Sequence, residues 1–348
     1  MTETSVRFPA EWEPQSAILI AWPHAGTDWA DRLGDVEDTY IALVQAITRF
    51  QPVLICVADD DVETYADIRL RSNRVDMARV RFVTVAYDDT WLRDSGPISL
   101  RDGDRLRLLD FRFTAWGGKF EAGRDDLLVD TLAAQGVFGD AARQRIDFAL
   151  EGGGIETDGN GTLLTTWHCL HERHPDASRE ELTAQLSAWL HQDRVLWLDH
   201  GALEGDDTDA HIDTLARFAP GDAIVFQACD DEADSHYADL KAMADEIAAL
   251  RTRDGKPYRL FPLPWARPVL DSGEDGQPRR LAASYANFLI INGAVLMPAY
   301  GDAADNAAAA VLALAFPGRE IVQVPCRPLI WQNGSLHCIT MQLPEGLV

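Results

Sequence analysis

Basic side chains are scarce in this sequence. Its 348 residues include 31 lysines and arginines against 56 aspartates and glutamates, so the formal net charge is −25 at pH 7. A nucleic-acid partner requires a basic face that neutralises phosphates, and anionic membranes attract basic segments, so we expect neither partner. The excess of carboxylates can steer a cationic small substrate, or it can serve only to maintain solubility.

Long apolar runs are missing too. The most apolar stretch, NFLIINGAVLMPAY at residues 287–300, is interrupted by Asn292, Gly293 and Pro298. It is shorter than the roughly 20 apolar residues that cross a bilayer, so no membrane span is expected. The first 15 residues contain no basic region followed by an apolar run, so we expect no signal peptide.

The sequence has few cysteines and no closely spaced cysteine pairs. The five cysteines are an odd number, are widely spaced and include no CxxC pair. A disulfide framework is therefore not expected, and the pattern is typical of a protein from a reducing cytoplasm. Cys56 and Cys229 lie in apolar, strand-like runs and are interpreted as buried fillers.

The remaining pattern is that of an α/β protein. Short runs rich in β-branched residues, such as PVLICVA (52–58), RVRFVTVA (79–86) and AIVFQA (223–228), alternate with amphipathic segments. The amphipathic segments predict helices over 35–50, 178–192, 235–253 and 305–316. No linker is evident, and the polar stretch at 271–280 is predicted to be a surface loop. Phosphate-binding and dinucleotide-binding glycine motifs are absent.

Cys338 is the first candidate for chemistry. It follows a glycine-bearing turn in WQNGSLHCITMQLPEG and precedes a strand-like segment. A thiol at the junction of a turn and a strand can be both accessible and held still, as a nucleophile requires. The alternative is that Cys338 is a small buried apolar residue, and the motif alone leaves both open.

A histidine and carboxylates form the other candidates. His211 and Asp213 alternate in DDTDAHIDTLARF, and on an extended segment their side chains would point to one side. Such a pair can combine a proton shuttle with an anionic clamp, although a solvated edge strand would carry the same tripeptide. Glu151 precedes three glycines that permit a close backbone approach, or else it caps a surface turn.

A further carboxylate lies beside an indole. Asp94 precedes the turn residues Ser95 and Gly96, and Trp91 lies three residues before it. A carboxylate next to an aromatic face suits a guanidinium or ammonium group. The alternative is a salt bridge between Arg93 and Asp94 within the turn, with Trp91 in the core.

Together these segments resemble a known family. The motifs WPH, DDTWLRDSGP, FTAWGGK, EGGGIETDGNGTLLTT, HIDTLARF and SLHCITMQLP occur here in one order. The chain resembles the agmatine deiminases and their bacterial peptidyl-arginine-deiminase-like relatives, of the guanidino-modifying (pentein) superfamily, from Pro9 to Pro344. The resemblance implies one catalytic domain over 1–348, built as a five-bladed α/β propeller of ββαβ-type units around an acidic channel. One departure is Ala210, since a glycine often precedes the histidine in relatives.

The resemblance also implies roles and a reaction. Cys338 matches the nucleophile, His211 the general acid/base, Asp94 and Asp213 the carboxylates that hold the guanidinium, and Glu151 the acidic residue that orients the histidine and faces the substrate. The implied reaction is hydrolysis of agmatine to N-carbamoylputrescine and ammonia, a step in putrescine and polyamine biosynthesis, without metal or organic cofactor. Further substrate-binding candidates are Trp91, Trp116 and Asp89.

Other functions stay open at this point. The substrate can be another guanidino compound, such as an arginine derivative or peptidyl-arginine, or the chain can be a non-catalytic polyamine-binding relative. The cluster of His168, Cys169, His171 and His174 would suit a metallohydrolase, although H-C-x-H-x-x-H matches no regular zinc spacing. The implied partner is a small cationic guanidino substrate, and a homodimer is left open.

Overall fold

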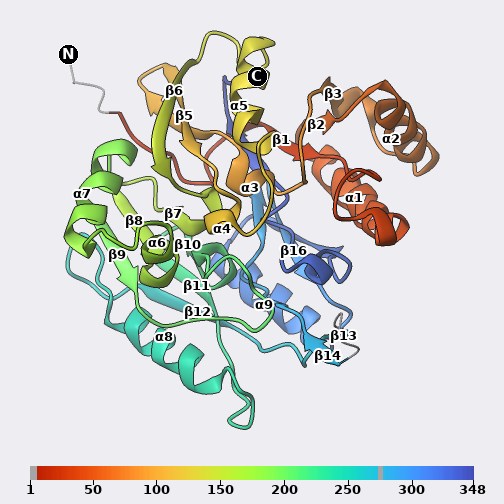
Figure 1. Cartoon of the computed structure of the whole chain (residues 1–348). Coiled ribbons are helices and arrows are strands. Elements are labelled where there is room, and N and C mark those ends of the chain that lie inside the picture. The colour runs from red at the N-terminus through yellow and green to blue at the C-terminus, as the bar shows by residue number, and fades with distance from the viewer. Residues whose placement is uncertain (1–5, 273–276) are drawn as a thin grey trace.

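The computed structural model describes residues 6–272 and 277–348. Within these ranges the chain forms a mixed α/β fold of several small sheets rather than one continuous sheet (Figure 1). The α/β class expected from the alternation of strand-like and helical runs is therefore confirmed. In the same ranges, no helix has both the length and the apolar character needed to span a membrane.

Four of the described sheets have three strands and share one plan. The first two strands pair antiparallel through a short turn, and the third pairs parallel with the second. A parallel neighbour requires a crossover connection, and helical segments supply it in each sheet. The four sheets comprise β4 (Ile98–Asp102), β5 (Arg105–Arg112) and β6 (Ala142–Ala149); β7 (Ile155–Thr157), β8 (Thr162–Thr166) and β9 (Arg194–Leu198); β10 (Ala216–Ala219), β11 (Ala223–Gln227) and β12 (Arg259–Leu263); and β15 (Leu289–Ile291), β16 (Ala294–Ala299) and β17 (Glu320–Pro325).

A four-stranded sheet joins the two ends of the chain. Its order is β18 (Met341–Pro344), β1 (Gln15–Ala21), β2 (Val53–Val57) and β3 (Val80–Thr84). The last strand pairs antiparallel with the first, and Leu19 lies opposite Met341. Because Cys338 comes just before β18, this pairing places the C-terminal cysteine beside the N-terminal strand.

Helices cover the sheets from outside, and Figure 1 shows α1, α2, α7 and α8 at the periphery. Local signals fix their ends: α7 begins with a capping box between Ser178 and Glu181, and the Asp59 side chain accepts from the Val62 N–H at the start of α2. The helices of seven or more residues are α1 (Leu33–Thr48), α2 (Asp60–Ser72), α5 (Leu128–Ala134), α6 (Trp167–Arg173), α7 (Arg179–Leu190), α8 (Tyr237–Ala249) and α9 (Asp305–Ala315).

The surface loop predicted at 271–280 is partly wrong. β13 (Leu270–Ser272) and β14 (Pro278–Arg280) form an antiparallel pair, while residues 273–276 of that prediction lie outside the described residues. Backbone hydrogen bonds hold these two strands together. Such pairing does not require alternating apolar residues, so the polar sequence did not predict strands here.

Candidate active site

The cysteine, the histidine and the three carboxylates singled out in the sequence lie together. The Cys338 Sγ is 3.8 Å from Asp213 Oδ2, the His211 Nδ1 is 3.6 Å from Asp94 Oδ1, and the His211 Nε2 is 3.7 Å from Glu151 Oε2. Every one of these side chains is buried. The fold therefore brings five ionisable groups from four distant segments into one small, buried volume.

Short turns, not regular strands, carry these groups. Asp94 lies in the four-residue helix α3 (Leu92–Ser95), Glu151 precedes the 3-10 turn η4 (Gly152–Gly154), and His211 precedes the 3-10 turn η5 (Ile212–Thr214). The extended segment predicted for His211 and Asp213 is therefore wrong. The Thr214 N–H and hydroxyl both donate to the His211 carbonyl, which closes the chain into a turn.

Gly153 makes this close approach possible. A Cβ at Gly153 would lie 2.6 Å from the His211 Nδ1 and 2.7 Å from the Asp94 Oδ1. Both distances are too short for real atoms, so any side chain would push the imidazole away from the carboxylate. The triple glycine noted in the sequence serves this approach at its middle residue.

Neutral donors hold the Asp94 carboxylate. The Trp116 indole N–H donates to Asp94 Oδ2 at 3.0 Å, and the Gly153 N–H donates to Oδ1 at 2.9 Å. Burial raises the pKa of Asp94 to about 6, although the nearby His211 opposes this shift. The alternative salt bridge to Arg93 is not formed, because that guanidinium donates to the Gln342 side chain instead.

Asp213 is held from one side only. The His337 Nδ1 lies 2.7 Å from its Oδ2, while its Oδ1 is buried and has no hydrogen-bond partner within the described chain. Burial would raise the pKa of Asp213, but the hydrogen bond and charge of His337 lower it overall. An ionised carboxylate with a free oxygen is a ready acceptor for an N–H group.

Arg173 holds Glu151. The Arg173 Nε donates to Glu151 Oε1 at 2.8 Å, and a second guanidinium nitrogen lies 2.6 Å from Asp209 Oδ2. Burial would raise the pKa of Glu151, but the nearby His211 and the charge and hydrogen bond of Arg173 lower it overall. Glu151 is thus an ionised partner for the histidine.

His211 is fully buried, and neither ring nitrogen has a hydrogen-bond partner in the described residues. Burial would lower the pKa of His211, but the charges of Asp94 and its other neighbours raise it well above the ordinary value. An imidazolium with two unpaired N–H groups can donate a proton to a departing base.

The surroundings of the Cys338 thiol favour its protonated form. Burial and the Asp213 and Asp94 carboxylates raise its pKa well above the ordinary value. The Asn287 amide donates to its Sγ at 3.3 Å, which is the stabilising contact that a thiolate would use. A cation bound between the carboxylates would remove most of the obstacle to ionisation.

A pocket of about 1180 Å³ opens above the cysteine. Cys338, Asp94, Asp89, Trp91 and Trp116 all line it, so the three further substrate-binding candidates face one cavity with the nucleophile candidate. Burial raises the pKa of Asp89 to about 7. A cation in the pocket would therefore draw Asp89 into its ionised form.

Carboxylates outnumber cations on the wall of this pocket. Arg32 and Arg279 are the basic residues among its described lining, and both are occupied. Arg32 lies 2.8 Å from Asp271, and Arg279 donates to the Asn333 side chain at 3.0 Å. The pocket is therefore suited to a positively charged ligand.

The histidine-rich stretch at 168–174 forms helix α6, and its imidazoles do not converge. His171 stacks on Trp167, and His174 stacks on Phe148. Cys169 points away from them, toward the site, and contributes to the upward pKa shift of His211. Among the described residues, the group of three side chains close enough to share a metal ion is Glu151, Cys169 and His211.

Sequence reasoning missed several residues that hold the site. Arg173, His337 and Asn287 contact Glu151, Asp213 and Cys338, respectively. His337 could have been found from its position next to the cysteine. Arg173 and Asn287 lie in segments with no local signal, because only the fold brings them to their partners.

Comparisons with known proteins show which family the chain belongs to. The family model of Porphyromonas-type peptidyl-arginine deiminases matches residues 7–344. The chain is 35% identical over 361 aligned positions to a curated agmatine deiminase of Stutzerimonas stutzeri, covering 98% of this chain and 96% of the relative.

Two solved structures are also similar. A protein of Porphyromonas gingivalis with a provisional assignment as an arginine deiminase is 44% identical, with a TM-score of 0.89 and coverage of 99% of this chain and all of that one. A cysteine-to-serine variant of C. jejuni agmatine deiminase, solved with its substrate bound, is 34% identical, with a TM-score of 0.89 and coverage of 99% and 98%.

Proposed function

From its membership in the Porphyromonas-type peptidyl-arginine deiminase family, to which the chain belongs, we propose that it is an agmatine deiminase. It hydrolyses the guanidinium group of agmatine to give N-carbamoylputrescine and ammonia. The observation that carries the proposal is a buried thiol among an imidazolium and three carboxylates at the base of an acidic, aromatic pocket.

The lining of the pocket favours agmatine over arginine derivatives. Agmatine ends in an amine, whereas arginine and C-terminal peptidyl-arginine end in a carboxylate. A carboxylate would need a free cation, but Arg32 in the lining forms an ion pair with Asp271. The Arg279 guanidinium donates to the Asn333 side chain and the Trp331 carbonyl. Asp89 is the acceptor we assign to the amine, with Trp91 and Trp116 flanking the aliphatic chain.

The guanidinium lies between Asp94 and Asp213. A planar guanidinium offers paired N–H donors, and the unpartnered Asp213 Oδ1 accepts from one edge while Asp94 accepts from another. Two fixed carboxylates hold its central carbon in front of the Cys338 sulfur, which lies 3.8 Å from Asp213 Oδ2. The bound cation also lowers the cost of forming a thiolate there.

The reaction then runs in two halves. As the cation binds, the Cys338 thiol releases its proton to solvent. The thiolate attacks the guanidinium carbon, and the adduct loses ammonia after His211 donates a proton to the leaving nitrogen. A covalent thiouronium remains on the sulfur. His211, now neutral, takes a proton from water, the hydroxide adds to the same carbon, and the C–S bond breaks to release the ureido product and the thiol.

The whole chain serves this one reaction. We assign residues 1–348 to a single catalytic domain, with the recurring strand–strand–helix–strand units as five blades around the pocket. In this assignment the five units are the four three-stranded sheets of one plan and the sheet that joins the two chain ends. The site residues come from the turns that leave these sheets.

The test is ammonia release from a panel of agmatine, arginine and N-acylated arginines. Wild-type protein should prefer agmatine, and Cys338→Ser should abolish turnover while it still binds agmatine, because a serine alkoxide is too costly beside carboxylates. Cys229→Ser is the matched control, since Cys229 contacts none of the site residues and should keep full activity. A preference for arginine, or an active Cys338→Ser variant, would contradict the proposal.

A further inference from the structure

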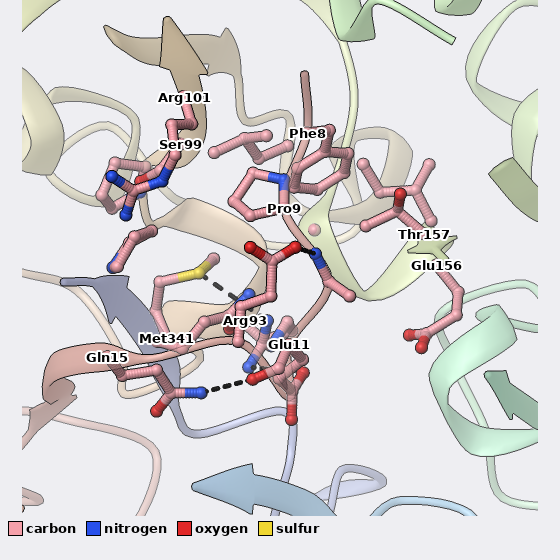
Figure 2. A pocket seen from close by; sticks show the side chains of 18 of the residues that line it. Phe8, Pro9, Glu11, Gln15, Arg93, Ser99, Arg101, Glu156, Thr157 and Met341 are labelled. Atoms are coloured by element: carbon pink, nitrogen blue, oxygen red, sulfur yellow. Dashed lines mark hydrogen bonds and ion pairs between the residues drawn. The ribbon is translucent and has the colours of Figure 1, made fainter. Parts of the chain in front are cut away.

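A second, smaller pocket lies behind the nucleophile. It has a volume of about 40 Å³, and Figure 2 shows Glu11 and Arg93 side by side within it. Neighbouring residues face opposite cavities: Arg93 and His337 line this rear pocket, whereas Asp94 and Cys338 line the acidic pocket. Two short turns thus form a thin wall, with substrate-facing groups on one side and another set of charges on the other.

The rear set of charges is a buried ion network. Glu11 Oε2 accepts from Arg217 at 2.8 Å and lies 2.7 Å from the His337 Nε2. Its other oxygen accepts from the Ile290 N–H at 2.7 Å, so Glu11 is fixed by three elements. Arg217 also donates to Glu156 at 2.7 Å. Each of these charged side chains is buried.

His337 bridges this network to the substrate clamp. Its Nδ1 lies 2.7 Å from Asp213 Oδ2 and its Nε2 lies 2.7 Å from Glu11 Oε2. Ionised carboxylates only accept hydrogen bonds, so both ring nitrogens must donate. A neutral imidazole would aim a lone pair at one of the two carboxylates. The two contacts therefore describe an imidazolium.

We propose that His337 is a positioning residue: Glu11 holds it as an imidazolium, and in that form it keeps Asp213 ionised, with its second oxygen turned toward the substrate. This role rests on the proposed deiminase function of the same site. In this role His337 acts only through Asp213 and contacts neither the substrate nor the reacting sulfur. The cysteine, the carboxylate and the imidazolium would then act as one unit, tuned from the rear pocket by the N-terminal segment.

The other charges around Asp213 do not replace this contact. His211 faces it from the same turn, Arg217 from β10, and Asp94 from α3. Cys338 lies on the adjoining loop. Among these groups, only the Cys338 thiol donates to Asp213 within the described structure, in a long contact of 3.8 Å. Loss of His337 would therefore leave a buried carboxylate with one weak donor. Such a group favours its protonated form.

The test is the pH profile of kcat/KM for His337→Gln. The variant lacks the imidazolium charge that stabilises ionised Asp213, so the pKa of Asp213 should rise. Asp213 and Asp94 should then both become protonated on the acidic side of the profile. We expect the acidic limb to steepen from one proton to two and to move to higher pH, with kcat/KM at pH 7 at least about tenfold lower. An unchanged limb, with only a lower melting temperature, would overturn the proposal.

If His337→Gln folds poorly, a matched pair of other variants tests the same proposal. Glu11→Gln and Glu156→Gln each remove a buried carboxylate that pairs with Arg217, but only Glu11 contacts His337. Glu11→Gln should shift the acidic limb upward, whereas Glu156→Gln should leave it in place. Equal profiles for the two variants would contradict the role of His337.

A direct readout separates this inference from the proposed function. In protein labelled with [15N]histidine, the signals that His337→Gln removes should show a bound proton on both ring nitrogens at pH 7. One unprotonated nitrogen would overturn the inference even if agmatine is hydrolysed. Doubly protonated His337 in a protein that fails to hydrolyse agmatine would instead count against the proposed function alone.

Discussion

At the scale of single residues, the site depends on backbone geometry as much as on charged groups. Because Gly153 has no side chain, His211 and Asp94 can lie close to its backbone. Ala210, immediately before His211, adopts a φ of 67°. That left-handed conformation favours glycine, which is the residue that relatives often have there. The departure noted in the sequence is therefore a point of backbone strain beside the histidine.

Ala210→Gly should stabilise the protein. The substitution removes a Cβ from a left-handed residue, so we expect the free energy of unfolding to rise by about 1 kcal/mol. Ala46→Gly is the matched control, because Ala46 lies inside helix α1, where glycine should lower stability by about 1 kcal/mol. Urea unfolding of both variants measures the effect, and a destabilised Ala210→Gly would show that the alanine methyl group is needed for packing.

The pH dependence of catalysis should follow Asp94. Burial raises its pKa to about 6 in the empty site, so below that pH it is neutral and cannot pair with a guanidinium. We expect kcat/KM for agmatine to fall about tenfold per unit as the pH drops below about 6. The acidic limb of kcat should lie at lower pH, because bound cation favours the ionised carboxylate. Coincident limbs would argue against Asp94 as part of the clamp.

The state of the Cys338 thiol can be tested with two alkylating reagents. Since burial, Asp213 and Asp94 raise its pKa, neutral iodoacetamide should react slowly at pH 7, and faster only well above the ordinary thiol value of about 8.5. A haloacetamidine carries a cation into the clamp and should react faster and at lower pH. A single low apparent pKa for both reagents would indicate a resting thiolate–imidazolium pair with His211.

At the scale of elements, periodicity predicted the regular structure and failed at the turns. The predicted helices at 35–50, 178–192, 235–253 and 305–316 correspond to α1, α7, α8 and α9, because each buries one apolar face. The segment around His168 gave no such signal, yet it forms α6, since Trp167 and Leu170 pack against the neighbouring core.

The candidate site shows the same division. The structure brings together Cys338, His211, Asp94, Asp213 and Glu151, which local motifs and family resemblance had singled out. The extended geometry predicted for His211 and Asp213 was wrong, because side-chain hydrogen bonds from threonines decide a short turn and leave no periodic trace. The long-range partners Arg173 and Asn287 could not be predicted for a different reason. No regular spacing in the sequence relates them to Glu151 and Cys338.

Helix α6 should matter for catalysis through Arg173. Arg173→Gln leaves Glu151 buried without its cation, and breaking such a pair typically costs about 3–5 kcal/mol. The pKa of Glu151 should rise, so kcat should fall along with the melting temperature. Arg71→Gln removes an exposed pair with Asp67 and should change neither, which makes it the control. Normal kcat in Arg173→Gln would show that Glu151 does not need this partner.

At the scale of the whole molecule, the net charge of −25 creates a negative electrostatic potential that extends beyond the protein surface. Substrate with two positive charges should be drawn toward the acidic pocket, and salt screens this attraction. We expect kcat/KM for agmatine to fall as ionic strength rises from about 20 to about 500 mM. Alkylation of Cys338 by neutral iodoacetamide should be insensitive over the same range, and a salt-independent kcat/KM would exclude steering.

The pairing of β18 with β1 has a consequence for how the protein is made. A growing chain presents β1 early, but one edge of that strand stays open until Met341–Pro344 emerge. The cysteine lies just ahead of β18, so the site cannot form until residues up to Cys338 have been translated. Contacts between such distant segments form slowly, and an open strand edge invites aggregation meanwhile. A chain that lacks β18 would therefore be expected to be inactive and to be a substrate for chaperones and proteases, rather than a weaker enzyme.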